Sequence, residues 1–169
     1  MGYQLICRGC RAAFSEDHYR CPVCGGVLEC EFDLRDRDRF AGILRGASRF
    51  WDYRELLPVR GDALVSIGEG STALVDAPHL AAALGVGTIF VKNEGQNPSG
   101  TFKDRCLSVG YTKARELGAP ATVIGSAGNA GAAAAAYAAA AQIPVSALTA
   151  VIGAPFFIYL VRKTGGWRL

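Results

Sequence analysis

Four of the six cysteines form two Cys-x-x-C pairs near the beginning of the chain. They are Cys7, Cys10, Cys21 and Cys24. Two thiolates at this spacing can bind one metal ion from a tight turn, and two such turns supply a tetrahedral four-sulfur site. Gly25 and Gly26 follow the second pair and permit a sharp turn in which backbone amides approach the sulfurs. Because the protein fills all four ligand positions, the pattern predicts a structural zinc ion. Iron in the same site and a redox-active dithiol pair are the alternatives.

Lys103 stands in the stretch "NPSGTFKDR", residues 97–105. Thr101 and Asp104 have the spacing of a helix capping box, which places Lys103 in the first helical turn. The helix dipole disfavours the ammonium form there and favours a neutral amine that can react with an aldehyde. The same helix end attracts anions such as phosphate or carboxylate. From these residues alone, a surface lysine paired with Asp104 is the simpler interpretation.

A second candidate is "GSAGNAG", residues 125–131, between an expected strand and an expected helix. Ser126 and Asn129 can cap the helix, and the amides at its start can bind a carboxylate or a phosphate. The glycines are spaced G-x-x-G-x-x-G, unlike the G-x-G-x-x-G of dinucleotide-binding folds, and no acidic residue follows to bind a ribose. Ordinary helix capping by small residues is the alternative.

These candidates lie in a segment where strand and helix patterns alternate. We expect strands at residues 63–67, 88–93, 121–125 and 143–148, and helices at 77–84, 101–117 and 129–142. Such alternation predicts an α/β fold in which βαβ units build a parallel sheet. A transmembrane segment over Ile143–Val161 is the alternative for the apolar end, but Pro144 and Pro155 interrupt it.

The composition favours a folded domain with a small appendage, since half of the 169 residues are hydrophobic. We expect a metal ribbon over residues 1–32, a helical connector over 33–62 and an α/β domain over 63–169. The net charge of +3 is too small to indicate nucleic-acid binding. No secretory signal pattern opens the sequence, so the cytoplasm is the expected compartment, where cysteines bind metals or lie in cores.

Five features in order resemble threonine synthase. They are the double Cys-x-x-C, "WDYRELLPV" at 51–59, "GEGST" at 68–72, "NPSGTFKDR" at 97–105 and "SAGNAG" at 126–131. Threonine synthases are pyridoxal-phosphate enzymes of the tryptophan-synthase-β fold type, also called fold type II. The resemblance covers residues 7 to about 144. It implies the N-terminal part of such an enzyme: a zinc ribbon followed by a partial three-layer fold with a parallel sheet.

The resemblance also implies roles for individual residues. Lys103 matches the lysine that bonds to pyridoxal 5′-phosphate and moves protons, and Asn129 matches the asparagine that binds the 3′-oxygen of the cofactor. Ser126 and the amides of the following turn, including Gly128, match a loop that binds the substrate carboxylate or phosphate. The segment from Glu69 to Thr72 would border the same cleft. The implied reaction converts O-phosphohomoserine to threonine and phosphate, so an amino acid is the expected small-molecule substrate.

The sequence departs from the family in two respects. Ala73 replaces the usual proline after "GEGST", which loosens a turn. From about residue 145 the chain no longer resembles the family, and it lacks the later glycine-rich phosphate loop and the hydroxyl residue that binds the pyridine nitrogen. We therefore expect a truncated α/β domain with uncovered apolar surface, and either a homo-oligomer or a complementing chain as partner.

Two further functions remain open at this point. The first is a different reaction on the same scaffold, such as serine/threonine dehydration or cysteate synthesis. The second is a non-catalytic module in which the zinc ribbon binds a protein or a nucleic acid.

Overall fold

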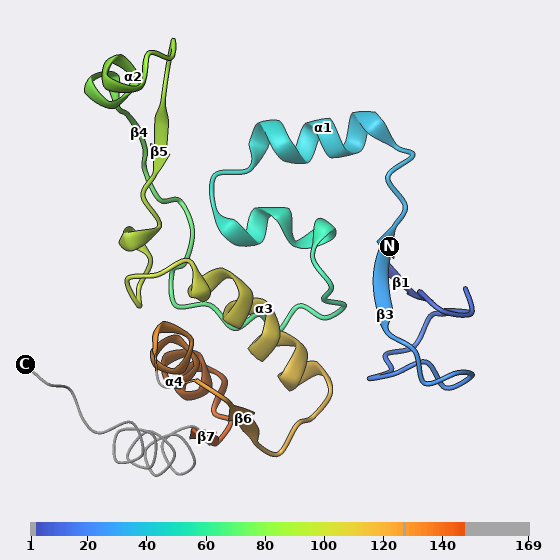
Figure 1. Cartoon of the computed structure of the whole chain (residues 1–169). Helices are drawn as coiled ribbons and strands as arrows, with labels where there is room; N and C mark the ends of the chain where they lie inside the picture. Colours follow the sequence, from blue (N-terminus) through green and yellow to red (C-terminus); the bar gives the residue numbers. More distant parts are fainter. Residues whose placement is uncertain (1–2, 127, 148–169) are drawn as a thin grey trace, which may run out of the picture. The chain divides into compact units, whose positions relative to one another are not determined.

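The computed structural model describes residues 3–126 and 128–147 of the chain. The chain divides into two compact units, Met1–Asp62 and Ala63–Leu169. Within the first unit, β1 (Tyr3–Cys7), β2 (Ala13–Phe14) and β3 (Leu28–Phe32) form an antiparallel sheet in the order β2-β1-β3 (Figure 1). The side chains of Tyr3, Leu5 and Cys7 on the central strand are buried. Burial thus alternates along β1, so that one face of the strand is covered. Cys7 lies on this covered face, at the C-terminal end of the strand.

Two helices follow the sheet in the same unit. Helix α1 (Arg37–Gly46) begins where the Asp36 carboxylate accepts a hydrogen bond from the Arg39 amide at 3.1 Å. A 3-10 helix, η1 (Phe50–Leu56), follows. The carboxylate of Asp52 accepts hydrogen bonds from the amides of Ser48 and Arg49 at its start. Acidic side chains thus bind the unpaired amides at the start of each helix.

The second unit contains all the predicted α/β elements except the first strand, and in addition β4 and η2, which were not predicted. Its elements in chain order are β4 (Leu74–Asp76), α2 (Pro78–Leu84), β5 (Phe90–Lys92), η2 (Glu94–Gln96), α3 (Lys103–Glu116), β6 (Thr122–Ile124), α4 (Asn129–Ala141) and β7 (Val145–Ala147). Strands β6 and β7 pair in parallel, as predicted, and α4 connects them. Strands β4 and β5 pair antiparallel, with Val75 opposite Val91, so the expectation of a parallel sheet is wrong for this pair.

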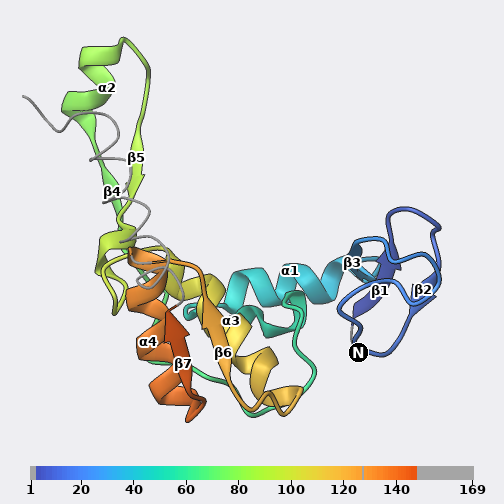
Figure 2. The ribbon, with the colours of Figure 1, turned by 60° about the horizontal axis from the view of Figure 1, so that its bottom comes forward.

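The core of the second unit lies between α3 and α4. Helix α4 turns one face inward, formed by Ala133, Ala134, Tyr137, Ala138 and Ala141. Small alanine side chains allow close packing, and Tyr111 of α3 and Ile143 complete the core together with Val65. Figure 2 shows β6 and β7 side by side next to α4. The alanine run of α4 is therefore a packing surface.

Residues 63–67, all described by the structure, form no strand, contrary to the prediction. The side chains of α3 bind the backbone of this segment instead. The Val65 amide donates to Thr112 Oγ1 at 2.8 Å, and the Val65 carbonyl oxygen accepts from Ser108 Oγ at 2.8 Å. Because both polar groups of Val65 bond to side chains, the segment stays extended without a neighbouring strand.

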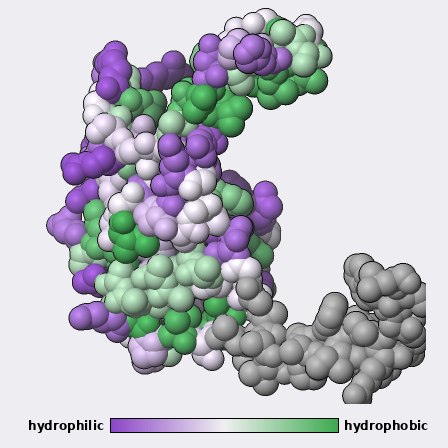
Figure 3. All heavy atoms as spheres, turned by 90° about the vertical axis from the view of Figure 1, so that its left-hand side faces the viewer, coloured by the Kyte–Doolittle hydropathy of each residue, from purple (hydrophilic) through white to green (hydrophobic). Residues whose placement is uncertain are grey.

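The segment β4–α2–β5 exposes large apolar side chains to solvent. They are Leu74, Val75, Leu80, Leu84, Val86, Phe90 and Val91. The upper part of Figure 3, where this segment lies, shows hydrophobic surface beside hydrophilic surface. This hairpin and its helix therefore present apolar surface that could bind a partner.

Among residues 3–126 and 128–147, no helix has the length and hydropathy needed to cross a bilayer. Most of the segment expected to depart from the family, and most of the alternative transmembrane segment, lie outside the described residues.

Candidate functional site

The four cysteines of the two Cys-x-x-C pairs lie together in the first unit. Their sulfur atoms are all within 4.8 Å of one another. Cys7 Sγ lies 3.5 Å from Cys24 Sγ, and the sulfurs of Cys10 and Cys21 are 3.6 Å apart. The donor set and its size fit one metal ion with four thiolate ligands.

The turn after the second pair is shaped for these sulfurs. The Gly25 amide donates to the Cys21 carbonyl oxygen at 2.8 Å, and Gly25 has a φ of 72°. A Cβ atom on Gly26 would lie 3.0 Å from Cys7 Sγ, so a side chain there would crowd the cluster. The Cys10 amide lies 3.5 Å from Cys7 Sγ and lowers the pKa of that thiol to about 6. This favours the thiolate, which is the form that binds a metal.

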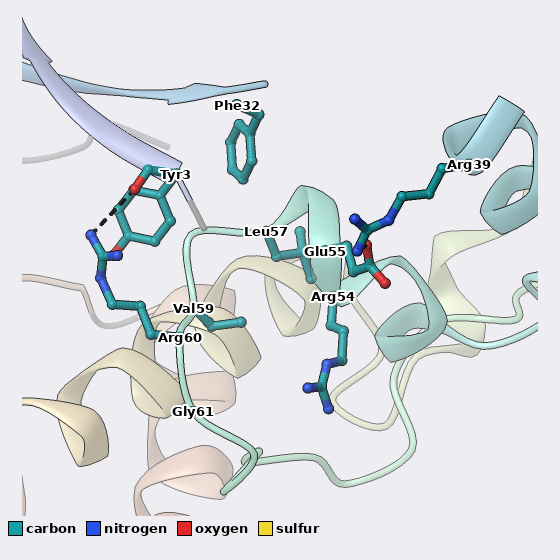
Figure 4. A pocket seen from close by; sticks show the side chains of 9 residues that line it. All are labelled: Tyr3, Phe32, Arg39, Arg54, Glu55, Leu57, Val59, Arg60 and Gly61. Atoms are coloured by element: carbon teal, nitrogen blue, oxygen red, sulfur yellow. Dashed lines mark hydrogen bonds and ion pairs between the residues drawn. The ribbon is translucent and has the colours of Figure 1, made fainter. Parts of the chain in front are cut away.

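A pocket of about 170 Å³ lies elsewhere in this unit (Figure 4). It is lined by Tyr3, Phe32, Arg39, Arg54, Glu55, Leu57, Val59, Arg60 and Gly61. Its arginines pair with carboxylates: Arg39 with Glu55, Arg54 with Asp62 and Arg60 with Asp17. The pocket contains none of the predicted site residues. Each of these guanidinium groups has an acidic partner, which opposes the binding of an anion in the pocket.

In the second unit, the "GEGST" segment forms a tight loop before β4. Gly68 and Gly70 have φ values of 96° and 89°, which favour glycine, and Ser71 adopts a φ of 52°. Thr72 is buried, and its hydroxyl donates to Glu94 Oε1 at 2.7 Å. The Gly70 amide donates to Asn97 Oδ1 at 3.0 Å. The loop is thus bonded to the stretch that precedes Lys103.

A bidentate ion pair between Arg105 and Glu94 holds the carboxylate that Thr72 contacts. Arg105 donates to both carboxylate oxygens of Glu94, at 2.7 and 2.8 Å, and also contacts Thr72 Oγ1 at 3.3 Å. The Arg105 guanidinium lowers the pKa of Glu94 to about 2. Sequence reasoning did not assign Glu94 or Arg105 a role. The sequence signal that could have predicted this ion pair is an acidic residue directly before "GQNPSGTFKD" and an arginine directly after it.

Lys103 is the first residue of α3. Its amide donates to Thr101 Oγ1 at 3.1 Å, and its ammonium lies 4.6 Å from the centre of the Phe102 ring. The predicted reciprocal capping box is wrong, because the Asp104 carboxylate accepts from the Ser99 amide at 2.8 Å and thereby closes the loop in front of the helix. Asp104 therefore orders the loop before α3 and is not bonded to Lys103 as an ion pair in the described contacts.

The other described lysines have amines bonded to oxygen. Lys92 donates to the Thr72 carbonyl oxygen, and Lys113 pairs with Glu116. The Lys103 amine instead lies over the face of the Phe102 ring. Among the lysines in the described part of the chain, it is thus the one whose amine is not held by a carbonyl or carboxylate oxygen.

The "GSAGNAG" segment leads into α4. Gly128 is the N-cap residue of α4, and no side chain caps the helix, so the predicted capping by Ser126 or Asn129 is wrong. The Ser126 hydroxyl oxygen instead accepts a hydrogen bond from the Gly128 amide at 3.3 Å. Asn129 is the first helical residue and is exposed. A Cβ atom on Gly131 would lie 2.3 Å from the Ser126 carbonyl oxygen. The close approach of helix and loop thus requires glycine at position 131.

Helices α3 and α4 pack against each other, so the elements that begin at Lys103 and Asn129 belong to one packed core. Thr72 is bonded to this assembly through Glu94 and Arg105. The four-sulfur cluster belongs to the other unit.

Comparison with known proteins assigns the family. A family model described as pyridoxal-phosphate dependent enzyme matches residues 65–166. Threonine synthase of Methanosarcina acetivorans is 40% identical over 149 residues, which cover 86% of this chain and 36% of that protein. Threonine synthase of Methanocaldococcus jannaschii is 39% identical over 129 residues, covering 73% of this chain and 32% of that protein.

A third relative, threonine synthase of Synechocystis, is 46% identical over 110 residues, covering 64% of this chain and 25% of that protein. The chain thus spans 25% to 36% of the length of these relatives. The resemblance predicted from the sequence motifs is confirmed. The chain belongs to the family of pyridoxal-phosphate-dependent enzymes and is similar, over most of its own length, to part of threonine synthase.

Proposed function

We propose that this chain provides the lysine-bearing part of a threonine-synthase-type enzyme, which converts O-phosphohomoserine to threonine and phosphate. The observation that supports this best is Lys103 at the first position of α3, which packs against α4, the helix that begins at Asn129. Pyridoxal phosphate, when bound, supplies the electron sink for reactions at an amino acid, and the protein orients the reactants and moves protons.

The remaining site residues have proposed roles that fit their positions. Lys103 would hold the cofactor and would accept or donate protons at its amine nitrogen. Asn129, exposed at the start of α4, binds the cofactor 3′-oxygen. Ser126 and the amide of Gly128 bind the substrate carboxylate or phosphate, because amides at a helix start favour anions. Thr72 borders the cleft. The residues present fit the reactive end of the cofactor.

The proposed fold is the first part of fold type II, with β6–α4–β7 as one parallel unit of a larger three-layer domain. The proposed domain limits are 1–32, 33–62 and 63–169. The proposed partners are a homo-oligomer or a complementing chain, in the cytoplasm.

We also propose a structural zinc ion at Cys7, Cys10, Cys21 and Cys24, in a zinc ribbon. The support is a cluster of four sulfurs in which Gly26 leaves room for the ligands. Zinc suits a site whose four positions are all occupied by thiolates, because it accepts tetrahedral geometry and needs no further ligand. The ion would stabilise a unit whose sheet is small.

Covalent labelling tests the enzymatic proposal. The purified chain is incubated with pyridoxal phosphate, reduced with borohydride, and mapped by mass spectrometry. We expect label at Lys103 in preference to Lys92, Lys113 and Lys163, and we expect it to be lost in Lys103→Arg. Lys113→Arg, on the same helix, is the control. Equal labelling of all four lysines would contradict the proposed site.

A further inference from the structure

Glu69 is a buried carboxylate in the centre of the second unit, and the proposed chemistry leaves it unused. Only 4% of the surface of Glu69 is exposed to solvent. Glu69 Oε2 accepts hydrogen bonds from Tyr137 Oη at 2.9 Å, the Ile67 amide at 3.0 Å and Ser66 Oγ at 3.2 Å. Glu69 Oε1 is in hydrogen-bond contact with Ser108 Oγ. Burial opposes ionisation, but these hydrogen bonds outweigh it and lower the pKa of Glu69.

Two partners of this carboxylate belong to the two helices that begin at the proposed site residues. Ser108 is in α3, which begins at Lys103, and Tyr137 is in α4, which begins at Asn129. Both Ser108 and Tyr137 are fully buried. An α-helix transmits position along its axis, because each turn is bonded to the next. Fixing Ser108 and Tyr137 against one carboxylate therefore fixes the starts of both helices relative to each other.

The rest of the same loop is bonded to the stretch in front of Lys103. Beyond Glu69, the Gly70 amide bonds to Asn97 and the Thr72 hydroxyl bonds to Glu94. One short loop thus contacts α3, α4 and the residues leading into α3. We propose that Glu69 is a positioning residue that sets Lys103, Asn129 and Thr72 in register for the cofactor, an inference that rests on the proposed function.

Removal of single hydroxyl groups tests this role. Tyr137→Phe removes the bond from α4 to Glu69. Ser108→Ala removes the bond from α3 to Glu69 and also the bond to the Val65 carbonyl oxygen. Thr112→Val is the matched control, because Thr112 is equally buried on α3 and bonds to the same segment at Val65, but does not touch Glu69. The control thus loses one buried hydrogen bond between the same two parts of the chain.

The first readout is hydrogen–deuterium exchange of the full chain, which needs no cofactor. In Tyr137→Phe and Ser108→Ala we expect the amides of residues 68–72 and of the first turns of α3 and α4 to exchange about five- to tenfold faster. Thr112→Val should leave these amides unchanged and affect exchange near Val65. Unchanged exchange in the first two variants, or equal acceleration in the control, would overturn the proposal.

The second readout is the preference of pyridoxal phosphate for Lys103 over Lys113. We expect it to fall in Glu69→Ala and to return in Glu69→Gln. In the latter variant the side-chain amide oxygen would keep the bonds made at Oε2, while the amide NH₂ group would donate to Ser108 Oγ. Ser108 could then give its single hydroxyl proton to the Val65 carbonyl oxygen. A preference retained in Glu69→Ala would refute the positioning role.

The two readouts separate the inference from the proposed function. Absence of any lysine preference in the wild-type chain would refute the proposed cofactor site, whereas the exchange result alone decides whether Glu69 orders the loop and both helices.

Discussion

Gly131 and Gly110 offer a matched test of how closely α4 approaches the loop in front of it. Both glycines lie within helices, Gly131 in α4 and Gly110 in α3. A Cβ atom on Gly131 would lie 2.3 Å from the Ser126 carbonyl oxygen, while a Cβ on Gly110 has no atom within 4 Å. The same substitution by alanine therefore meets a backbone atom in one helix and open space in the other.

The expected difference follows from two opposing contributions. Alanine in place of glycine stabilises a helix by up to about 1 kcal/mol. Overpacking in a tight site costs about 1–3 kcal/mol, and a backbone oxygen cannot move aside as a flexible side chain can. Gly110→Ala should therefore raise the free energy of unfolding by up to about 1 kcal/mol. Gly131→Ala should lower it by up to about 2 kcal/mol, so the two variants should differ by about 1–3 kcal/mol.

The assay is urea unfolding followed by far-ultraviolet circular dichroism, with both variants and the wild type measured under the same conditions. The difference between the two variants is the informative quantity, because the helix-propensity contribution is common to them. Equal stabilisation by both substitutions would refute the close approach of α4 to Ser126. A loss of stability in Gly110→Ala would refute the open environment of that position.

Three further predictions concern other parts of the molecule. Cys10→Ser should reduce the zinc content and lower the melting temperature of the first unit, whereas Cys30→Ser, outside the four-sulfur cluster, should change neither; metal analysis and calorimetry measure both. Because the pKa of Glu94 falls from 4.5 to about 2 on folding, its stabilisation is complete above 4.5 and is lost as the pH falls towards 2. Glu94→Gln should flatten the fall of the urea midpoint across that window, and an unchanged slope would contradict the ion pair with Arg105. Phe90→Ser on the exposed hairpin should reduce concentration-dependent self-association in analytical ultracentrifugation, and unchanged association would place the contact elsewhere.

The sequence predicted the elements of the second unit that have strong local signals. Helix α2 stops at Gly85, which adopts φ 67°, and the helix containing Lys103 ends before Gly118 with φ 63°. The parallel pairing of β6 and β7 follows from a short crossover through α4. In each case the information lies within a few residues of the element, so a local pattern suffices.

The features that the sequence did not predict correctly share a physical cause, which is contact between residues far apart in the chain. The pattern of residues 63–67 resembles a strand, but Ser108 and Thr112, far along the chain, take the hydrogen bonds of Val65. The antiparallel pairing of β4 and β5 likewise depends on how α2 turns the chain, which hydrophobic pattern alone does not specify. Sequence reasoning selected Lys103 and Thr72, but not the Glu94–Arg105 pair that connects them, because its geometry exists only after folding.

The hydroxyls of Ser108 and Thr112 also bear on the order in which the chain folds. Val65 is separated from Thr112 by 47 positions, and Glu69 from Tyr137 by 68. Contacts of such long range form slowly, because the intervening chain must first lose conformational freedom. Their partners lie on helices, so residues 65–69 can dock only against α3 and α4 that have already formed. In refolding, the amides of the two helices should therefore become protected before that of Val65, and the loop that borders the proposed cleft should be the last part to assemble.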